Sequence, residues 1–305
     1  MSSTTTSRKD ANVIKHGYRN QRTIARPASV QGTGFLTGAE VRLRFLPAPA
    51  NTGAVFLRVD LPGRPTIPAH VTQVSGTARR TTIGHGDVQV ALVEHVLAAL
   101  AGLRIDNCII ELDAPEPPGL DGSALGFVDA LIEADSTPQQ ARRDVCTVEE
   151  SIVVRQKGMS LAIHPHNEFK VSYILDYGLW SPITWQIHTQ GVTPGTFRSE
   201  LASCRTFLLE QEAAELRRQG LGSRTKTSDL LVFGASGPMD NKLRFGNEPA
   251  RHKCLDIVGD LALFGRDIRG HVVAYRSGHP MNVELVRLLN ERVASGKPSS
   301  QKRAA

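Results

Sequence analysis

Three side chains with metal-binding or acid–base chemistry recur at intervals of four residues within the segment 247–265. They are His252, Asp256 and Asp260, and most of their neighbours are apolar. Residues four apart lie on one face of an α-helix, so His252 and Asp256 could bind one metal ion from a single helix. Buried carboxylates require cationic or hydrogen-bonding partners, which a metal ion for Asp256 and a protonated histidine for Asp260 would supply.

A third metal ligand is expected from elsewhere in the chain, because a hydrolytic zinc site has three protein ligands and one open position. The candidate is His95, which follows Glu94 in the apolar segment 90–103. Neighbouring helix residues point about 100° apart, so one of the two could bind the metal while the other reaches a water molecule beside it. This division into ligand and general base is that of a metal hydrolase. His279, which follows a predicted strand, is a further candidate for the site, although a lone histidine more often has a structural role.

The secondary structure that must position these residues repeats in two halves. Each half is predicted as strands, a helix, a strand and a closing helix, and the first helix of each carries a histidine with a glycine seven positions later. The pattern predicts an α+β fold of two similar domains, each a small sheet packed with helices, over 19–143 and 144–295. The polar segments 1–18 and 296–305 are predicted to be disordered tails.

The individual elements are predicted from the period of the apolar residues and from the turn signals. The segment 40–61 is predicted as a β-hairpin, and the two halves are expected to join near 135–145. Helices are predicted at 90–103, 123–135, 248–265 and 280–295, and strands within 105–119, 151–177 and 268–279.

The composition restricts the class of protein. The chain has 305 residues, a net charge of +6 and four widely spaced cysteines without a C-x-x-C pair, which predicts a reduced, cytoplasmic protein. No stretch approaches the roughly 18 apolar residues of a membrane span, so no integral membrane segment is expected. The basic charge favours a polyanionic partner, which could be nucleic acid, an anionic membrane surface or a phosphorylated small molecule, or it is a solvated surface. Zinc-finger spacing and RNA-recognition motifs are missing, so a nucleic-acid partner is not expected.

Several motifs, in their order and spacing, resemble the UDP-3-O-acyl-N-acetylglucosamine deacetylases, a family of zinc amidases of lipid A biosynthesis. The motifs are GTGFLTG, PAPANTG, VEHVLAALAGLRIDN, APEPPGLDGSA, SCRTF, LRFGNEPARHKCLDIVGDL and YRSGHPMN. The resemblance implies two similar domains with the active site between them. It also implies hydrolysis of the N-acetyl group of UDP-3-O-acyl-N-acetylglucosamine with release of acetate. The expected partner is therefore this small UDP-linked acylated amino sugar, and we expect the enzyme to be a monomer.

The resemblance also implies a role for each matching residue. It implies that Zn²⁺ is held by His95, His252 and Asp256, although two histidines and a carboxylate also suit Fe²⁺. Glu94 would be the general base on the attacking water. His279 would be the partner acid or charge stabiliser, with Asp260 orienting it, and Thr206 would donate a hydrogen bond to the oxyanion. The implied substrate-binding residues are Lys253 for the diphosphate, Tyr177 for the nucleobase and Phe207 for the region of the acyl chain.

Some positions depart from the family pattern. Leu36 replaces a usual histidine, Pro280 replaces a small residue, and Arg79 and Arg80 stand where less charged residues are common. The two arginines could form surface charge or an additional phosphate contact. The segment after Phe207 also diverges, so a zinc amidase of the same fold acting on another N-acylated sugar is the alternative function. A non-catalytic relative with a structural metal is disfavoured, because all the catalytic residues are present.

Overall fold

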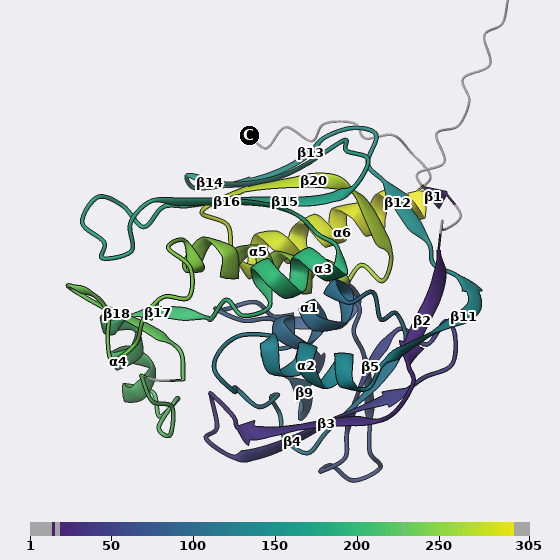
Figure 1. Ribbon diagram of the computed structural model, residues 1–305, viewed down its shortest axis with the longest axis horizontal. Helices are drawn as coiled ribbons and strands as arrows, with labels where there is room; N and C mark the ends of the chain where they lie inside the picture. The colour runs from purple at the N-terminus through teal and green to yellow at the C-terminus, as the bar shows by residue number, and fades with distance from the viewer. Residues whose placement is uncertain (1–13, 16–18, 228, 296–305) are drawn as a thin grey trace, which may run out of the picture.

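The two main sheets enclose a layer of helices (Figure 1). The structure, a computed structural model, describes residues 14–15, 19–227 and 229–295. The tails predicted at 1–18 and 296–305 therefore lie outside the described residues, apart from Ile14–Lys15. This pair forms the strand β1 and pairs with β12 (Val145–Thr147). Among the described residues, the helices are all too short or too polar to cross a membrane.

The first half of the chain forms the lower sheet of Figure 1 and the helices that lie on it. This sheet has the strand order β3-β4-β10-β5-β6, and two smaller sheets adjoin it, β2-β11 and β7-β8-β9. The strands are β2 (Asn20–Ile24), β3 (Ala28–Thr33), β4 (Glu40–Pro47), β5 (Ala54–Arg58), β6 (Thr66–Pro68), β7 (Val74–Gly76), β8 (Thr82–His85), β9 (Val88–Val90), β10 (Cys108–Leu112) and β11 (Ser136–Arg142), and the helices are η1 (Val71–Gln73), α1 (Glu94–Gly102) and α2 (Leu125–Glu133).

The predicted hairpin over 40–61 is wrong. Both of its strands form, but β10 lies between them, antiparallel to β4 and parallel to β5. The apolar strand β10 is best buried when both of its edges are paired. The connection between β4 and β5 passes across the start of β10, where the backbone N–H of Cys108 donates to the carbonyl of Gly53.

The second half forms the upper sheet, which is organised around β20. This strand pairs with β12 and β15 in parallel and with β14 in antiparallel orientation. Its residues alternate between buried and half-buried along the whole strand, as expected for a central strand with helices on one face. The remaining strands are β13 (Ile152–Gln156), β14 (Met159–His164), β15 (Phe169–Leu175), β16 (Gln186–Gly191) and β20 (Asp267–Tyr275), and the helices are α3 (Pro194–Thr196), η2 (Phe197–Leu201), α5 (Glu248–Ala262) and α6 (His279–Ser295).

The divergent segment after Phe207 forms a separate small unit at the left of Figure 1. It contains β17 (Phe207–Leu209), α4 (Glu210–Arg218), β18 (Leu231–Gly234) and β19 (Gly237–Pro238). The segment 135–145, where the halves were expected to join, is also ordered, because β11 pairs antiparallel with β2. The four long helices predicted from the sequence all form, within a few residues of the predicted ends.

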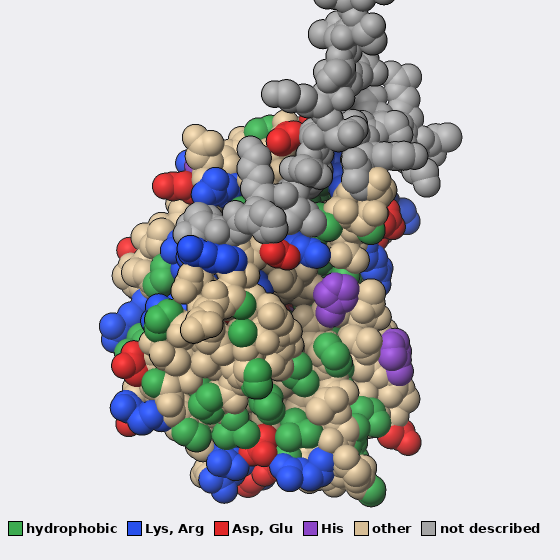
Figure 2. All heavy atoms as spheres, turned by 90° about the vertical axis from the view of Figure 1, so that its right-hand side faces the viewer, with side chains coloured by type: hydrophobic (Ala, Val, Ile, Leu, Met, Phe, Trp, Pro, Cys, Tyr) green, Lys and Arg blue, Asp and Glu red, His purple; other side chains and the backbone are tan. Residues whose placement is uncertain are grey.

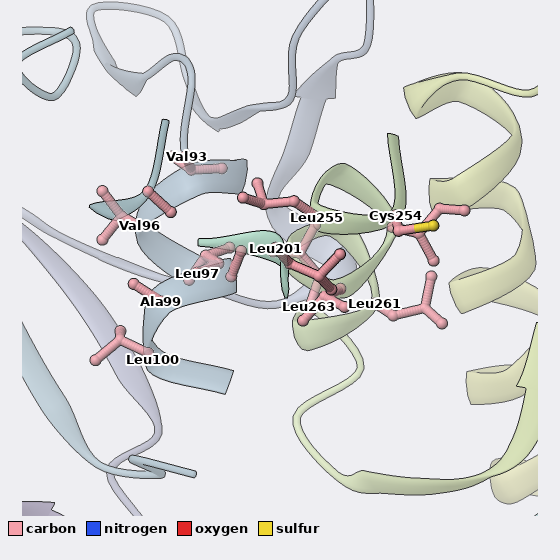
Figure 3. Close-up of a cluster of buried hydrophobic side chains, with 14 of the residues drawn as sticks. Val93, Val96, Leu97, Ala99, Leu100, Leu201, Cys254, Leu255, Leu261 and Leu263 are labelled. Atoms are coloured by element: carbon pink, nitrogen blue, oxygen red, sulfur yellow. The ribbon is translucent and has the colours of Figure 1, made fainter. Parts of the chain in front are cut away.

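The helices α1 and α5 pack against each other between the sheets, and apolar side chains from both fill the space around them (Figure 3). Their backbones approach most closely at Gly259, where a Cβ atom would lie 2.0 Å from the carbonyl oxygen of Glu94. Gly102 is a second close approach, since a Cβ atom there would lie 2.3 Å from the ring of Phe197. The glycine repeated in the two halves of the sequence thus marks tight packing in both, and at Gly259 it brings the first turn of α1 against α5.

Candidate active site

Two helices bring the three predicted metal ligands together. His252 and Asp256 lie one turn apart on α5, and His95 lies in the first turn of α1. One ligand atom from each lies within 4.8 Å of the others. The Oδ1 atom of Asp256 is 3.2 Å from Nε2 of His252 and 3.7 Å from Nε2 of His95. Both His252 and Asp256 are almost completely buried, and His95 is half-buried at the cavity side.

The hydrogen bonding of this group favours a cation. The Nδ1 atom of His252 lies 3.0 Å from the carbonyl oxygen of Cys204 and must donate to it, because a carbonyl only accepts. Burial lowers the pKa of His252 and favours the neutral ring, whose Nε2 then carries a lone pair. That lone pair faces Oδ1 of Asp256, a buried oxygen without a hydrogen-bond donor. Two electron-pair donors facing each other in a buried site need a positive charge between them, so the residues present fit a divalent metal.

The second oxygen of Asp256 accepts from Lys253. The Nζ atom of Lys253 lies 2.8 Å from Oδ2. Burial disfavours the ionised form of Asp256, but the charge of the His252 ring when it is protonated and the Lys253 ammonium outweigh this effect and hold the pKa of Asp256 well below its usual range. Asp256 is therefore a carboxylate at neutral pH, as a metal ligand must be.

Glu94 begins α1 and is buried beside the three predicted metal ligands. Its Oε2 atom accepts a hydrogen bond of 3.0 Å from the backbone N–H of Thr81. Burial raises the pKa of Glu94, and the charges of His279 and His95 oppose that shift. A carboxylate whose pKa is raised is a stronger base than an exposed one, which suits it to accept a proton.

His279 and Asp260 form a buried pair next to Asp256, whose Oδ2 atom lies 4.0 Å from Nε2 of His279. The Nδ1 atom of His279 lies 2.8 Å from Oδ2 of Asp260, which also accepts from Nδ2 of Asn282 at 2.9 Å. The hydroxyl of Thr81 donates to the other oxygen of Asp260 at 2.6 Å. Burial alone would lower the pKa of His279, but the charge of Asp260 and its hydrogen bond raise this pKa to about 9. His279 is therefore an imidazolium at neutral pH.

Thr81 and Asn282 are site residues that the sequence reasoning missed. Thr81 is fully buried and contacts two of the predicted catalytic residues. Its backbone N–H donates to the carboxylate of Glu94, and its hydroxyl donates to Asp260. It precedes β8, and no local pattern marks a threonine there as different from its neighbour Thr82. Asn282 lies in the first turn of α6, three residues after His279, and this helical spacing is the one signal that could have placed it near Asp260.

The active-site groups open into a cavity of about 670 Å³ between the two halves. Nine of the ten predicted site residues line it, and Asp260 lies behind His279. The ring of Phe207 is 6.1 Å from that of His252 and 5.9 Å from that of Tyr177. Lys253 points its Nζ atom at Phe207, 5.4 Å from the ring centre. The aromatic residues expected for the nucleobase and for the acyl chain therefore lie in contact with each other.

Of the positions that depart from the family pattern, Arg79 and Pro280 line this cavity, whereas Leu36 and Arg80 do not. The guanidinium of Arg79 is half-exposed and lies 3.0 Å from the carboxylate of Glu212 on α4. Its charge thus faces both the cavity and the divergent segment that contains α4.

Comparisons with a family model and with individual proteins identify the same family. The model of the family described as LpxC: UDP-3-O-acyl N-acetylglycosamine deacetylase matches residues 21–291. A UDP-3-O-acyl-N-acetylglucosamine deacetylase of Nostoc sp. is 38% identical over 275 residues, which cover 88% of this chain and 97% of that protein. A UDP-3-O-acyl-N-acetylglucosamine deacetylase of Chlamydia abortus is 38% identical over 274 residues, which cover 90% of this chain and 98% of that protein. The bifunctional enzyme LpxC/FabZ of Chlorobaculum tepidum is 38% identical over 313 residues, and the chain spans 66% of its length.

Proposed function

The chain belongs to the family of UDP-3-O-acyl N-acetylglycosamine deacetylases, and from this membership we propose its reaction. It hydrolyses the N-acetyl group of UDP-3-O-acyl-N-acetylglucosamine and releases acetate, a step of lipid A biosynthesis. The observation that carries the proposal is the buried oxygen of Asp256 that faces Nε2 of His252 without a donor. With Glu94 and the pair of His279 and Asp260 in the same cavity, this group supports amide hydrolysis.

His95, His252 and Asp256 would hold the metal ion, and we propose Zn²⁺, which prefers nitrogen and carboxylate ligands and leaves an open position. The same three donors also suit Fe²⁺. The metal supplies Lewis-acid activation of the water and of the amide carbonyl.

The protein's own residues move the protons. Glu94 removes a proton from the attacking water, since it is the buried carboxylate of the cavity that does not serve as a ligand or pair with Lys253. The imidazolium of His279 and the hydroxyl of Thr206 stabilise the negative oxygen that develops on the carbonyl. The leaving amine receives a proton from His279 or from Glu94, and both lie within the same cavity. Asp260 acts through His279 by orienting its ring and keeping it charged.

Substrate binding uses the outer part of the cavity. Lys253 would bind the diphosphate, for which its ammonium must exchange the carboxylate of Asp256 for a phosphate oxygen. Tyr177 would pack on the nucleobase and Phe207 would line the start of the acyl site. Because the two rings touch, we propose that the nucleotide and the acyl chain leave the sugar on either side of this aromatic pair. The cytoplasmic location and the monomeric state remain predictions.

The alternative substrate, another N-acylated sugar, is motivated by the divergent segment around α4, which supplies Leu208 and Glu212 to the cavity. One experiment separates the two. Acetate release is measured from UDP-3-O-acyl-N-acetylglucosamine and from UDP-N-acetylglucosamine, each with a chelator, and again after Zn²⁺ or Fe²⁺ is restored. We expect rapid, chelator-sensitive release from the acylated sugar alone. Equal or faster release from the sugar without the acyl chain would favour the alternative, and release that resists both the chelator and His252→Ala would contradict a metal hydrolase.

A further inference from the structure

An apolar loop projects from the edge of the upper sheet next to the active site. It connects β15 to β16 over residues 176–185 and extends beyond the strand ends at the left of Figure 1. Leu179 and Trp180 at its tip are each 97% exposed, and Trp185 is 61% exposed. These are the largest exposures of large hydrophobic side chains in the described part of the chain.

The loop is held in this conformation by its own contacts. Asp176 accepts from the N–H of Gly178 at 2.8 Å and from the hydroxyl of Tyr275 at 2.7 Å. Ile183 is buried and anchors the returning arm. The tip is therefore a turn supported at its base, which directs Leu179 and Trp180 away from the protein.

The exposure of these two apolar side chains to water is energetically unfavourable. Burial of a large apolar side chain stabilises a folded protein, and neither tip residue gains that stabilisation from the described part of the protein. Tryptophan has an apolar body and a polar N–H, and it is enriched where membranes meet water.

Basic side chains lie at the same edge of the sheet. β14 pairs Ser160 with Tyr275 of β20, and β15 pairs Ile174 with the same Tyr275. The hairpin of β13 and β14 and the residue after β20 therefore lie beside the loop. The exposed residues there are Arg155 near the end of β13, Lys157 in the turn and Arg276 after β20. Basic residues close to an anionic lipid surface are attracted to it electrostatically.

We propose that loop 176–185 docks the enzyme on an anionic phospholipid membrane. Leu179 and Trp180 insert at the level of the headgroups, while Arg155, Lys157 and Arg276 face the lipid phosphates. Tyr177 at the base of the loop, Lys157 and Arg276 all line the catalytic cavity, so docking turns the mouth of the cavity toward the membrane surface. If the proposed function holds, this is where an acylated substrate would concentrate, but the docking itself does not depend on that function.

The chain provides its own probe, because Trp180 and Trp185 are its two tryptophans. In the full chain with Trp185→Phe, the fluorescence of Trp180 is followed as vesicles are added. With equal parts of phosphatidylglycerol and phosphatidylcholine we expect a blue shift and quenching by brominated lipids. Vesicles of phosphatidylcholine alone should give a much weaker response, and so should about 0.5 M salt, because screening removes the attraction of the basic residues.

Co-sedimentation with the same vesicles tests the residues. The double substitution Leu179→Ser/Trp180→Ser should weaken binding at least tenfold, whereas Ile132→Ser, at a 38% exposed position on α2, should leave it unchanged. Binding that survives the double substitution would come from another basic surface and would overturn the proposal. The proposal is also contradicted if the fluorescence of Trp180 shifts to the blue without lipid and the protein does not bind vesicles. A shift caused by UDP-N-acetylglucosamine would mean that the loop closes over the nucleotide. A shift caused by higher protein concentration would mean that the tip is a contact between copies of the chain.

Discussion

The surroundings of two cavity side chains, Glu94 and His279, raise the pKa of both. Glu94 has one hydrogen-bond donor, the N–H of Thr81, and its burial raises its pKa toward the protonated form. His279 has a buried carboxylate behind its ring, and Asp260 keeps it positively charged. A base that accepts a proton and a cation that stabilises an oxyanion are thus prepared by the protein before a substrate arrives.

Glu94→Gln tests the base. The amide is nearly isosteric and can still accept from Thr81, but it cannot take a proton from water. We expect kcat to fall by about 10²–10⁴-fold with the metal content unchanged. Glu212→Gln, on the cavity rim beside Arg79, is the matched control and should stay within a few-fold of wild type. If Glu94→Gln also stays within a few-fold, the base lies elsewhere.

The pH dependence tests the pair of His279 and Asp260. A pKa raised to about 9 keeps the ring charged below that pH, so kcat/KM should fall as the pH rises through about 9. Asp260→Asn removes the main cause of the increase and should move this alkaline limb to lower pH, with the metal still bound. His279→Gln should lower kcat and remove the limb. An alkaline limb that stays in place in both variants would belong to another group.

The predictability of single residues follows from how local their contacts are. His252, Asp256 and Asp260 share one helix, so their common face follows from spacing alone. His95 could be proposed as the third ligand because the chemistry requires one, but its distance to Asp256 is set by the packing of α1 on α5. Thr81 could not be found, because its two contacts come from residues 13 and 179 positions away.

At the scale of elements, the close approach of α1 and α5 sets the geometry of the metal ligands. Two ligands lie on α5 and the third on α1, so the distance between the helices is also the distance between the ligands. Gly259 permits this distance, because its missing side chain leaves room for the backbone of Glu94. The site therefore depends on a residue with no functional group.

Gly259→Ala tests this dependence. The added methyl group would overlap the carbonyl of Glu94, so the helices must separate. We expect the free energy of unfolding to fall by about 1–3 kcal/mol and the metal affinity to fall as well, measured by chemical denaturation and metal titration. Gly246→Ala, just before α5, is the control, since nothing lies within 4 Å of its added Cβ. Metal affinity equal to wild type in Gly259→Ala would show that the helix spacing does not control the site.

The sequence predicted the elements better than their pairing. The helices α1, α2, α5 and α6 carry a long apolar period, which is a local property. The insertion of β10 between β4 and β5 is not local, because it depends on which strand gains most from two paired edges. Two consecutive strands with a turn-rich connection have the same sequence pattern whether they pair directly or have a third strand between them. The prediction of a hairpin over 40–61 failed for this reason.

At the scale of the molecule, a cluster of four charges joins the two halves. Asp106, just before β10, accepts from Arg19 at 2.6 Å and from Arg143 at 3.0 Å. Asp267, at the start of β20, lies 2.8 Å from Arg19 and 3.1 Å from Arg143. Each arginine thus bridges one carboxylate of each half, on a part of the molecule away from the catalytic cavity.

Asp106→Asn tests the contribution of this cluster. The amide keeps the shape but loses the charge that two arginines share, so we expect the free energy of unfolding to fall by about 1–3 kcal/mol, measured by urea denaturation. Glu215→Gln, which removes the exposed ion pair with Arg218, should change it by less than about 0.5 kcal/mol. Equal effects of the two variants would mean that the cluster is no stronger than a surface pair.

The central position of β20 in the upper sheet has a consequence for the order of events during synthesis. β12 and β15 each lie against β20, and β1 is joined to that sheet through β12. A ribosome adding about 5–20 residues per second needs roughly 6–25 s to make the stretch from Thr147 to Asp267. During that interval the edges of β12, β14 and β15 that pair with β20 have no partner. The helix α1 with His95 has been made before them. Stalled nascent chains in which β20 is still inside the ribosome should therefore be far more sensitive to protease in the second half than chains from which Tyr275 has emerged.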